Sequence, residues 1–336
     1  MYLSTDKHPR IGDNLDDHGP TKRYHYDDYE RSLNMTNKQW IQDRLARAEN
    51  RTKDLEKWVD TGVKPRQTAP GQDHSKKKNQ TYDFGDDNGP VLAHRHSNGG
   101  GWVADTATVT NTVFVGPTAR VFGNAIVNGR VELRGRAMVS GNALVLGHAV
   151  VSGRAHVRGD ATVSENARIR DNAVVSDYAC VAGNAIVKDD AWVSGDARVR
   201  DNTVVFGHAR VYGLAAINED AEIGGRAEIG GSASVGGDAV VNGNATVRGN
   251  ATVFAAATIS GNAWVLGDAT VGGHATVFGD AKVSGDAWIL DDAIVGGNAD
   301  VSGNVVISGD MVVSGNDVLH GYTSLNNPSV NLESTF

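Results

Sequence analysis

An aliphatic residue recurs at every sixth position of the chain from Val103 to Leu319. A small or aliphatic residue, most often alanine, stands two positions before nearly every one of them. A Gly-Asn or Gly-Asp pair follows many of them, as in residues 281–286 (Ala-Lys-Val-Ser-Gly-Asp). The repeat continues between these limits without an insertion. An internal repeat of fixed period and this length predicts a solenoid.

The spacing within each hexad predicts the conformation of the solenoid. Two residues two positions apart point to the same side of an extended segment, so alanine and valine face one interior. Glycine, asparagine and aspartate tolerate the left-handed backbone that ends each strand. Three such sides close one coil, and about twelve coils stacked at ~4.8 Å give a column of about 55–60 Å. We therefore predict an all-β protein with a single-stranded parallel β-helix over residues 99–320.

The hexads resemble the hexapeptide-repeat superfamily, whose members fold as left-handed parallel β-helices and are often trimeric acyltransferases. The resemblance covers about two thirds of the chain and implies a left-handed helix here. The enzymes usually carry an Ile-Gly step and a loop between coils, often end in a helix, and use a histidine near a subunit interface as base. In this chain the glycine comes one position later and no loop interrupts the hexads. The repeat, which opens with residues 99–103 (Gly-Gly-Gly-Trp-Val), is more similar to the long uninterrupted hexapeptide arrays of bacterial and prophage proteins.

Residues 1–62 differ in composition from the repeat. Residues 1–34 are polar and charged with scattered tyrosines, and they predict an extended or disordered arm, which is either a flexible tail or a segment that becomes ordered on a partner. Residues 35–62 predict an amphipathic helix, because residues 36–39 form a capping box and apolar residues follow at spacings of four and three. The helix packs on another surface or forms a short coiled coil. Its seam includes Ile41, Leu45, Leu55 and Val59.

Two further segments flank the repeat. Residues 63–98 contain prolines, a run of three lysines and few apolar residues, which is typical of a linker. After residue 320 the hexad dissolves, and residues 321–336 predict a C-terminal cap and tail. A cap is expected there because the last coil would otherwise expose an unpaired edge.

Charge and cysteine content limit the classes of partner. The chain has a net charge of −8, and residues 1–101 hold almost equal numbers of acidic and basic residues, so the repeat carries the acidic excess. An acidic rod is not expected to bind nucleic acid. The single cysteine, Cys180, excludes an intrachain disulfide framework. We find no signal peptide and no run of transmembrane length, and therefore expect no membrane association and a location in the cytoplasm or a virion.

Three histidines take the corner position that asparagine or aspartate normally holds. They are the candidate bases if the protein is an acyltransferase, and they cannot share one site within a chain because they lie on two different corners. Aspartates stack in register from one coil to the next, but turn formation explains them without a metal. We expect no metal site and no cofactor. The three candidate bases are His148, His208 and His274.

Two outward faces are candidate binding surfaces. One carries large apolar groups, which indicates a subunit interface, most simply between three parallel rods. Its residues are Phe114, Val150, Ile186, Val204, Phe206, Val240 and Ile294, with Phe278 and Val312 also on this face. The other carries aromatic and basic groups suited to a surface glycan or a protein partner. Its residues are Trp192, Arg210, Tyr212, Arg248 and Trp264.

These features favour a non-enzymatic rod, structural or adhesive, in a larger assembly. The resemblance to prophage arrays implies a phage or phage-like particle, such as a virion tail component, with residues 1–62 attaching or trimerising the rod. One alternative is a trimeric acyltransferase that uses acyl-CoA or an acyl-carrier protein. A second alternative is a glycan-binding module.

Overall fold

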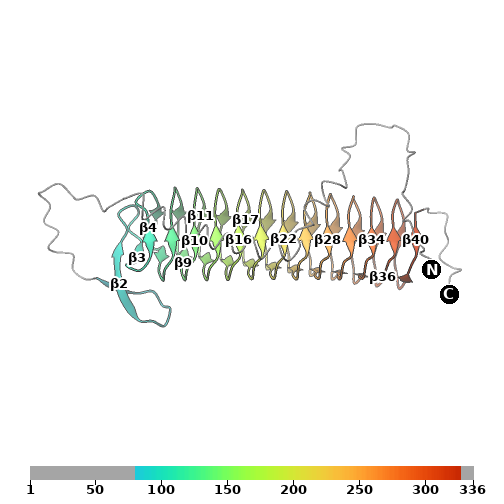
Figure 1. The fold of residues 1–336 in the computed structure, drawn as a ribbon, viewed down its shortest axis with the longest axis horizontal. Coiled ribbons are helices and arrows are strands. Elements are labelled where there is room, and N and C mark those ends of the chain that lie inside the picture. Colours follow the sequence, from blue (N-terminus) through green and yellow to red (C-terminus); the bar gives the residue numbers. More distant parts are fainter. Residues whose placement is uncertain (1–79, 327–336) are drawn as a thin grey trace, which may run out of the picture. The chain divides into compact units, whose positions relative to one another are not determined.

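A computed structural model describes residues 80–326 of the chain. The predicted arm and helix of residues 1–62 lie outside the described residues. Three parallel sheets surround one interior, and the chain contributes one strand to each sheet in turn (Figure 1). This confirms the predicted parallel β-helix of about twelve coils.

Most strands are two residues long, and successive strands along the chain join the three sheets in turn. In sheet 1, β3 (Trp102–Ala104) is followed by short strands from β6 (Arg120–Val121) to β33 (Lys282–Val283), one from each coil, then by β36 (Asp300–Gly303) and β39 (Val318–Gly321). Sheet 2 runs in the same way from β4 (Thr108–Val109) to β40 (Ser324–Leu325). Sheet 3 runs from β5 (Phe114–Val115) to β38 (Val312–Val313). The register is constant, as in the pairing of Trp192 with Arg210.

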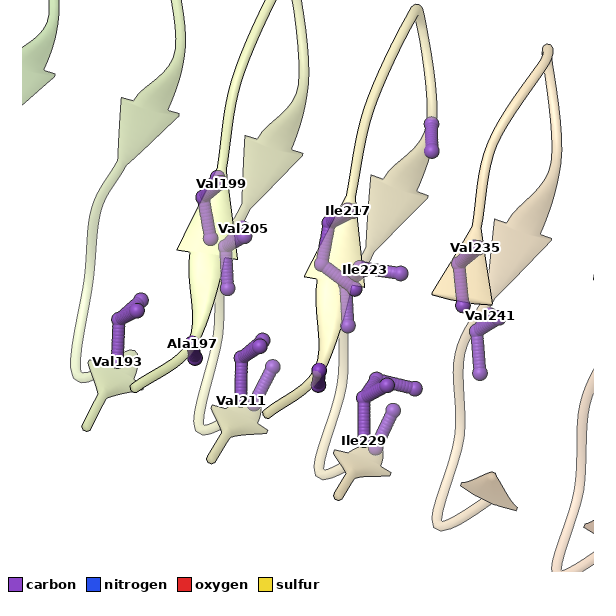
Figure 2. Packing of buried hydrophobic residues seen from close by; sticks show 14 of the residues in the cluster. Val193, Ala197, Val199, Val205, Val211, Ile217, Ile223, Ile229, Val235 and Val241 are labelled. Carbon is purple, nitrogen blue, oxygen red and sulfur yellow. The ribbon is translucent and has the colours of Figure 1, made fainter. Parts of the chain in front are cut away.

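The interior is lined by the alanine and the aliphatic residue of each hexad. From Val113 to Val313 nearly all of these side chains are inaccessible to solvent. Figure 2 shows the aliphatic residues of successive coils pointing inward from three sides, with Ile217, Ile223 and Ile229 in consecutive strands. Thr203 replaces an interior alanine, and its hydroxyl donates to the carbonyl of Arg200 at 2.6 Å. The burial therefore agrees with the two-residue spacing predicted from the hexad.

From Gly123 onward each corner places one residue in the left-handed backbone region, and glycine usually occupies it. Seven corners use aspartate or glutamate at this position instead. In every one of these seven, a carboxylate oxygen accepts the backbone N–H of the residue 18 positions later, as when Asp189 accepts from Gly207 at 3.0 Å. These carboxylates therefore join consecutive coils at the corner. The seven are Glu165, Asp171, Asp177, Asp189, Asp201, Glu219 and Asp291.

The next corner residue forms a second connection between coils. Asparagine side chains there donate to the side-chain oxygen of the residue one coil further on, in runs most of which end on aspartate. One run passes from Asn166 through Asn184 and Asn202 to Asp220, with distances of 3.1, 3.0 and 2.8 Å. Aspartate has only acceptor oxygens when ionised, so it is a suitable last member of such a run.

A β-hairpin precedes the first coil. β1 (Thr81–Asp83) pairs antiparallel with β2 (Pro90–Arg95), which pairs antiparallel with β3 and extends sheet 1 at its N-terminal end (Figure 1). These residues belong to the segment that we predicted as linker, and for 81–95 the structure replaces that assignment. The residues between the two strands include Gly85 and Gly89 at positive φ, which are typical of a turn.

The hairpin is fixed by aromatic packing on the outer face of sheet 1. Tyr82 stacks on Trp102 with ring centroids 4.5 Å apart, and Phe84 stacks on Phe122 at 4.9 Å. The guanidinium of Arg95 lies 4.1 Å from the Trp102 ring. Since edge strands invite pairing with other chains, the hairpin also covers the start of the sheet. At the other end, β40 extends the helix to Leu325, beyond the boundary predicted at residue 320.

Candidate functional site

The structure keeps the three candidate catalytic histidines apart. His148, His208 and His274 are all exposed corner residues. The Nδ1 atom of His208 lies 3.7 Å from a carboxylate oxygen of Asp190, which follows the donor Asn172 in a corner run. That position is one of the structural corner connections described above. The geometry therefore brings no two of these imidazoles to one site within a chain.

Several corner aspartates accept a hydrogen bond from an asparagine one coil earlier. Asn250 donates to Asp268 at 2.7 Å, and Asn262 donates to Asp280 at 2.8 Å. Among residues 80–326 there is no group of three or more His, Cys, Asp or Glu side chains arranged to hold a metal ion. The described part of the chain also contains no helix long and apolar enough to cross a membrane.

The predicted interface residues of the repeat lie on the outer face of sheet 3, where all except Phe206 and Phe278 form one column of residues that precede the interior aliphatic residues. Three charged residues of the same column, Glu132, Arg168 and Glu222, divide it into short apolar stretches. The ring of Phe206 lies where a Cβ of Gly224 would be, with ring carbons 2.3 to 2.8 Å from that position. Phe278 lies in the same way over Gly296, although it remains 41% exposed. Part of this apolar surface is therefore packed against the next coil, and the subunit interface remains a prediction.

The outer face of sheet 1 contains a recurring contact that the sequence analysis missed. The first outward residue of one strand reaches across to a serine of the preceding coil in the same sheet. His156 Nε2 lies 2.8 Å from Ser140 Oγ, and the indole N–H of Trp192 donates to Ser176 Oγ at 3.0 Å. The two pairs have the same separation along the chain, and both serines are buried. The hydrogen bonds hold two planar rings in defined orientations against the sheet.

Basic side chains surround these rings. The guanidinium of Arg158 lies 5.9 Å from the centroid of the Trp192 ring. Further along the same face, Arg248 lies 5.6 Å from the Tyr212 ring and forms an ion pair with Glu228. Burial and the nearby Glu228 carboxylate raise the pKa of Tyr212, against the opposing effect of Arg248 and Arg210.

The structure thus places all five predicted glycan-contact residues on one face. Trp192 is 39% exposed and Trp264 is 49% exposed, and Arg210 lies beside Trp192 in the adjacent strand. Five further members of this surface were not predicted from the sequence, namely Ser140, His156, Arg158, Ser176 and Glu228. Their positions in the coil could have indicated them, because residues 16 to 20 positions apart lie close together in neighbouring coils.

The imidazole of His156 provides a test of this surface by pH. Burial, followed by the charges of Arg158 and Arg120, lowers the pKa of His156 from 6.5 to about 4. In the unfolded chain His156 therefore binds a proton near pH 6.5, whereas in the folded chain it binds one only near pH 4. The free energy of unfolding consequently falls as the pH decreases between these two values. The full shift would correspond to about 3 kcal/mol, and we expect about half of that because the ring is partly exposed.

The measurement compares denaturant unfolding of the parent and His156→Gln between pH 7.5 and 4.5. Above pH 7 the free energy of unfolding should depend on pH in nearly the same way in both proteins. On acidification below pH 7 the variant should lose less stability than the parent. Equal losses in the two proteins would show that the folded imidazole titrates normally.

Comparison with known proteins adds one distant likeness. No protein-family model and no curated protein matches the sequence. Among solved structures, the chain is similar to a UDP-N-acetylglucosamine acyltransferase from Arabidopsis, with 16% identity and a TM-score of 0.26. The match covers 57% of this chain and 68% of the other. At this TM-score the likeness carries no argument about activity, and the assignment as a parallel β-helix rests on the strand register.

Proposed function

We propose that the protein is a non-enzymatic rod, structural or adhesive, in a larger assembly. The observation that supports this proposal is the constant coil. From β3 to β40 each coil contributes one strand to every sheet, and no loop is inserted between coils. Loops between coils would supply the walls of a pocket, whereas identical coils supply length in steps of ~4.8 Å.

The hydrogen bonds between coils at the corners support a structural role for a stiff rod. Each coil is joined to the next by three parallel backbone ladders, and many coils are also joined by carboxylate or asparagine contacts at the corners. In a solenoid each repeat contacts only its neighbours, so strong contacts between neighbours make the column stiff. A left-handed winding and a place in a phage-like particle are part of this proposal and rest on the resemblance of the hexads.

We propose that residues 1–62 attach or trimerise the rod, and the oligomeric state in solution tests this. We expect the full chain to be a trimer and residues 80–336 to be a monomer by light scattering in solution. The shorter chain keeps the hairpin of β1 and β2, and so retains the aromatic packing that covers the first coil.

A trimer that survives the truncation would contradict attachment through the N-terminal segment and place the contact on the outer face of sheet 3. Clefts between neighbouring rods would then bring His148, His208 or His274 beside a second chain. In that case, titration with acyl-CoA would decide between a scaffold and an acyltransferase.

A further inference from the structure

The outer face of sheet 1 has the opposite charge to the corners beside it. Here the outer face means the residues that precede and follow each interior aliphatic residue of the sheet. Its cationic residues are Arg120, Arg158, Arg210, Arg248 and Lys282, and its acidic residues are Glu228 and Asp300. The chain as a whole has a net charge of −8, and the corners carry most of the carboxylates of the repeat. A strip of positive charge therefore runs along the coils between two acidic edges.

Aromatic rings alternate with these cations along the strip. In the direction of the coil axis, Trp192 is followed by Arg210, Glu228, Thr246, Trp264 and Lys282 in consecutive strands. The two tryptophans are four coils apart, or roughly 19 Å at the usual interstrand spacing. Both are exposed, while Thr246 between them is buried.

The rings are held before any ligand arrives. The hydrogen bond to Ser176 fixes the edge of the Trp192 indole. The Tyr212 ring rests on Gly230, whose Cβ position would be 2.5 Å from the ring, and Arg248 lies beside it. Aromatic side chains with one polar edge tied down present a flat apolar face, and fixing them in advance removes an ordering cost of binding.

The spacing of the cations distinguishes between two anionic polymers. Between Arg158 and Lys282 the strip carries about one cation for every two coils, or roughly one per 10 Å. A nucleic-acid strand carries one charge per ~3.4 Å, so its phosphates would outnumber the cations and face the acidic corners. A polysaccharide in which only some sugars bear a carboxylate has a lower charge density and many apolar sugar faces. The strip therefore fits the polysaccharide better.

We propose that this face, from Arg158 to Lys282, binds an acidic polysaccharide whose chain runs along the coil axis. Sugar rings stack on Trp192 and Trp264, and the carboxylates of the ligand pair with Arg210 and Lys282. The inference deepens the adhesive part of the proposed function by naming the class of ligand, and so rests on it. It does not depend on the oligomeric state, so the light-scattering experiment and the binding experiment can fail separately.

The test uses the full chain and hyaluronate, a polysaccharide in which every second sugar bears a carboxylate, as the probe, with calorimetry in low salt. We expect binding, and we expect Trp192→Ala and Arg210→Ala each to weaken it at least about tenfold, equivalent to about 1.4 kcal/mol. The matched controls are Phe278→Ala and Arg168→Ala on the outer face of sheet 3, both at exposed positions. These should change the affinity less than about twofold. Because Trp192 points away from the interior, Trp192→Ala should keep the fold. Thermal unfolding of this variant checks that expectation.

Three outcomes would overturn the proposal. The first is no binding of hyaluronate by the parent chain. The second is an equal loss of affinity in the sheet 1 variants and the sheet 3 controls. The third is displacement of hyaluronate by an equal concentration of oligothymidylate, which would indicate a surface for single-stranded nucleic acid. Tighter binding of hyaluronate than of neutral dextran, with the difference lost on raising the salt, would support the proposal, since paired charges are screened by salt.

Discussion

Replacing Ile223 by alanine is expected to lower the free energy of unfolding by about 3 kcal/mol. Ile223 is fully buried, and in β23 (Glu222–Ile223) it lies between Val205 and Val241 of the neighbouring coils. The interior cannot contract around the lost atoms, because the backbone of each three-sided coil fixes its circumference and the ladders tie each coil to the next. The cavity therefore persists, and its cost adds to the lost burial.

Denaturant unfolding of the parent and the variant at neutral pH measures this effect. Glu222→Ala is the matched control, because Glu222 is the exposed residue of the same strand. We expect it to change stability by at most about 0.5 kcal/mol. A cost below about 1 kcal/mol for Ile223→Ala would mean that the coil adjusts its width, contrary to a rigid column.

The sequence predicts the column in detail because its physical cause is local. The two-residue spacing of alanine and valine places both in one interior, and the corner residues place the turns, so the register follows from counting. The same reasoning could not find the hairpin of β1 and β2. Its packing depends on Phe84 meeting Phe122, two residues far apart in the chain that belong to no common period.

The candidate surfaces were predictable to different degrees. The face on which Trp192 and Trp264 lie follows from their positions in the repeat, and the structure places both there. The orientation of the rings does not follow, because it depends on Ser176 one coil earlier. In the same way, the exposure of Phe206 cannot be judged without Gly224, which receives its ring in the next coil.

Replacing Gly213 by valine is expected to cost about 3 kcal/mol, whereas aspartate at the same position should cost about 1 kcal/mol or less. Gly213 has a φ of 71°, and a Cβ there would lie 3.0 Å from the backbone nitrogen of Gly231. The left-handed region costs an ordinary residue about 1–2 kcal/mol, and a β-branched residue more. Aspartate tolerates this region, as Asp177 and Asp189 show at φ 60°. Its carboxylate would also accept the N–H of Gly231, and denaturant unfolding of the two variants measures the difference.

Ala255 allows the same argument to be tested in the opposite direction. It has a φ of 56° at a corner, yet its methyl group offers no acceptor to the next coil. Ala255→Asp should therefore raise the free energy of unfolding by about 1 kcal/mol, since it supplies a charged acceptor for the N–H of Gly273. Ala255→Gly should give a smaller gain, from relief of backbone strain alone. If denaturant unfolding finds that Ala255→Asp raises the free energy of unfolding no more than Ala255→Gly does, the corner carboxylates are explained by their preference for turns alone. In that case their hydrogen bonds contribute little to the joining of the coils.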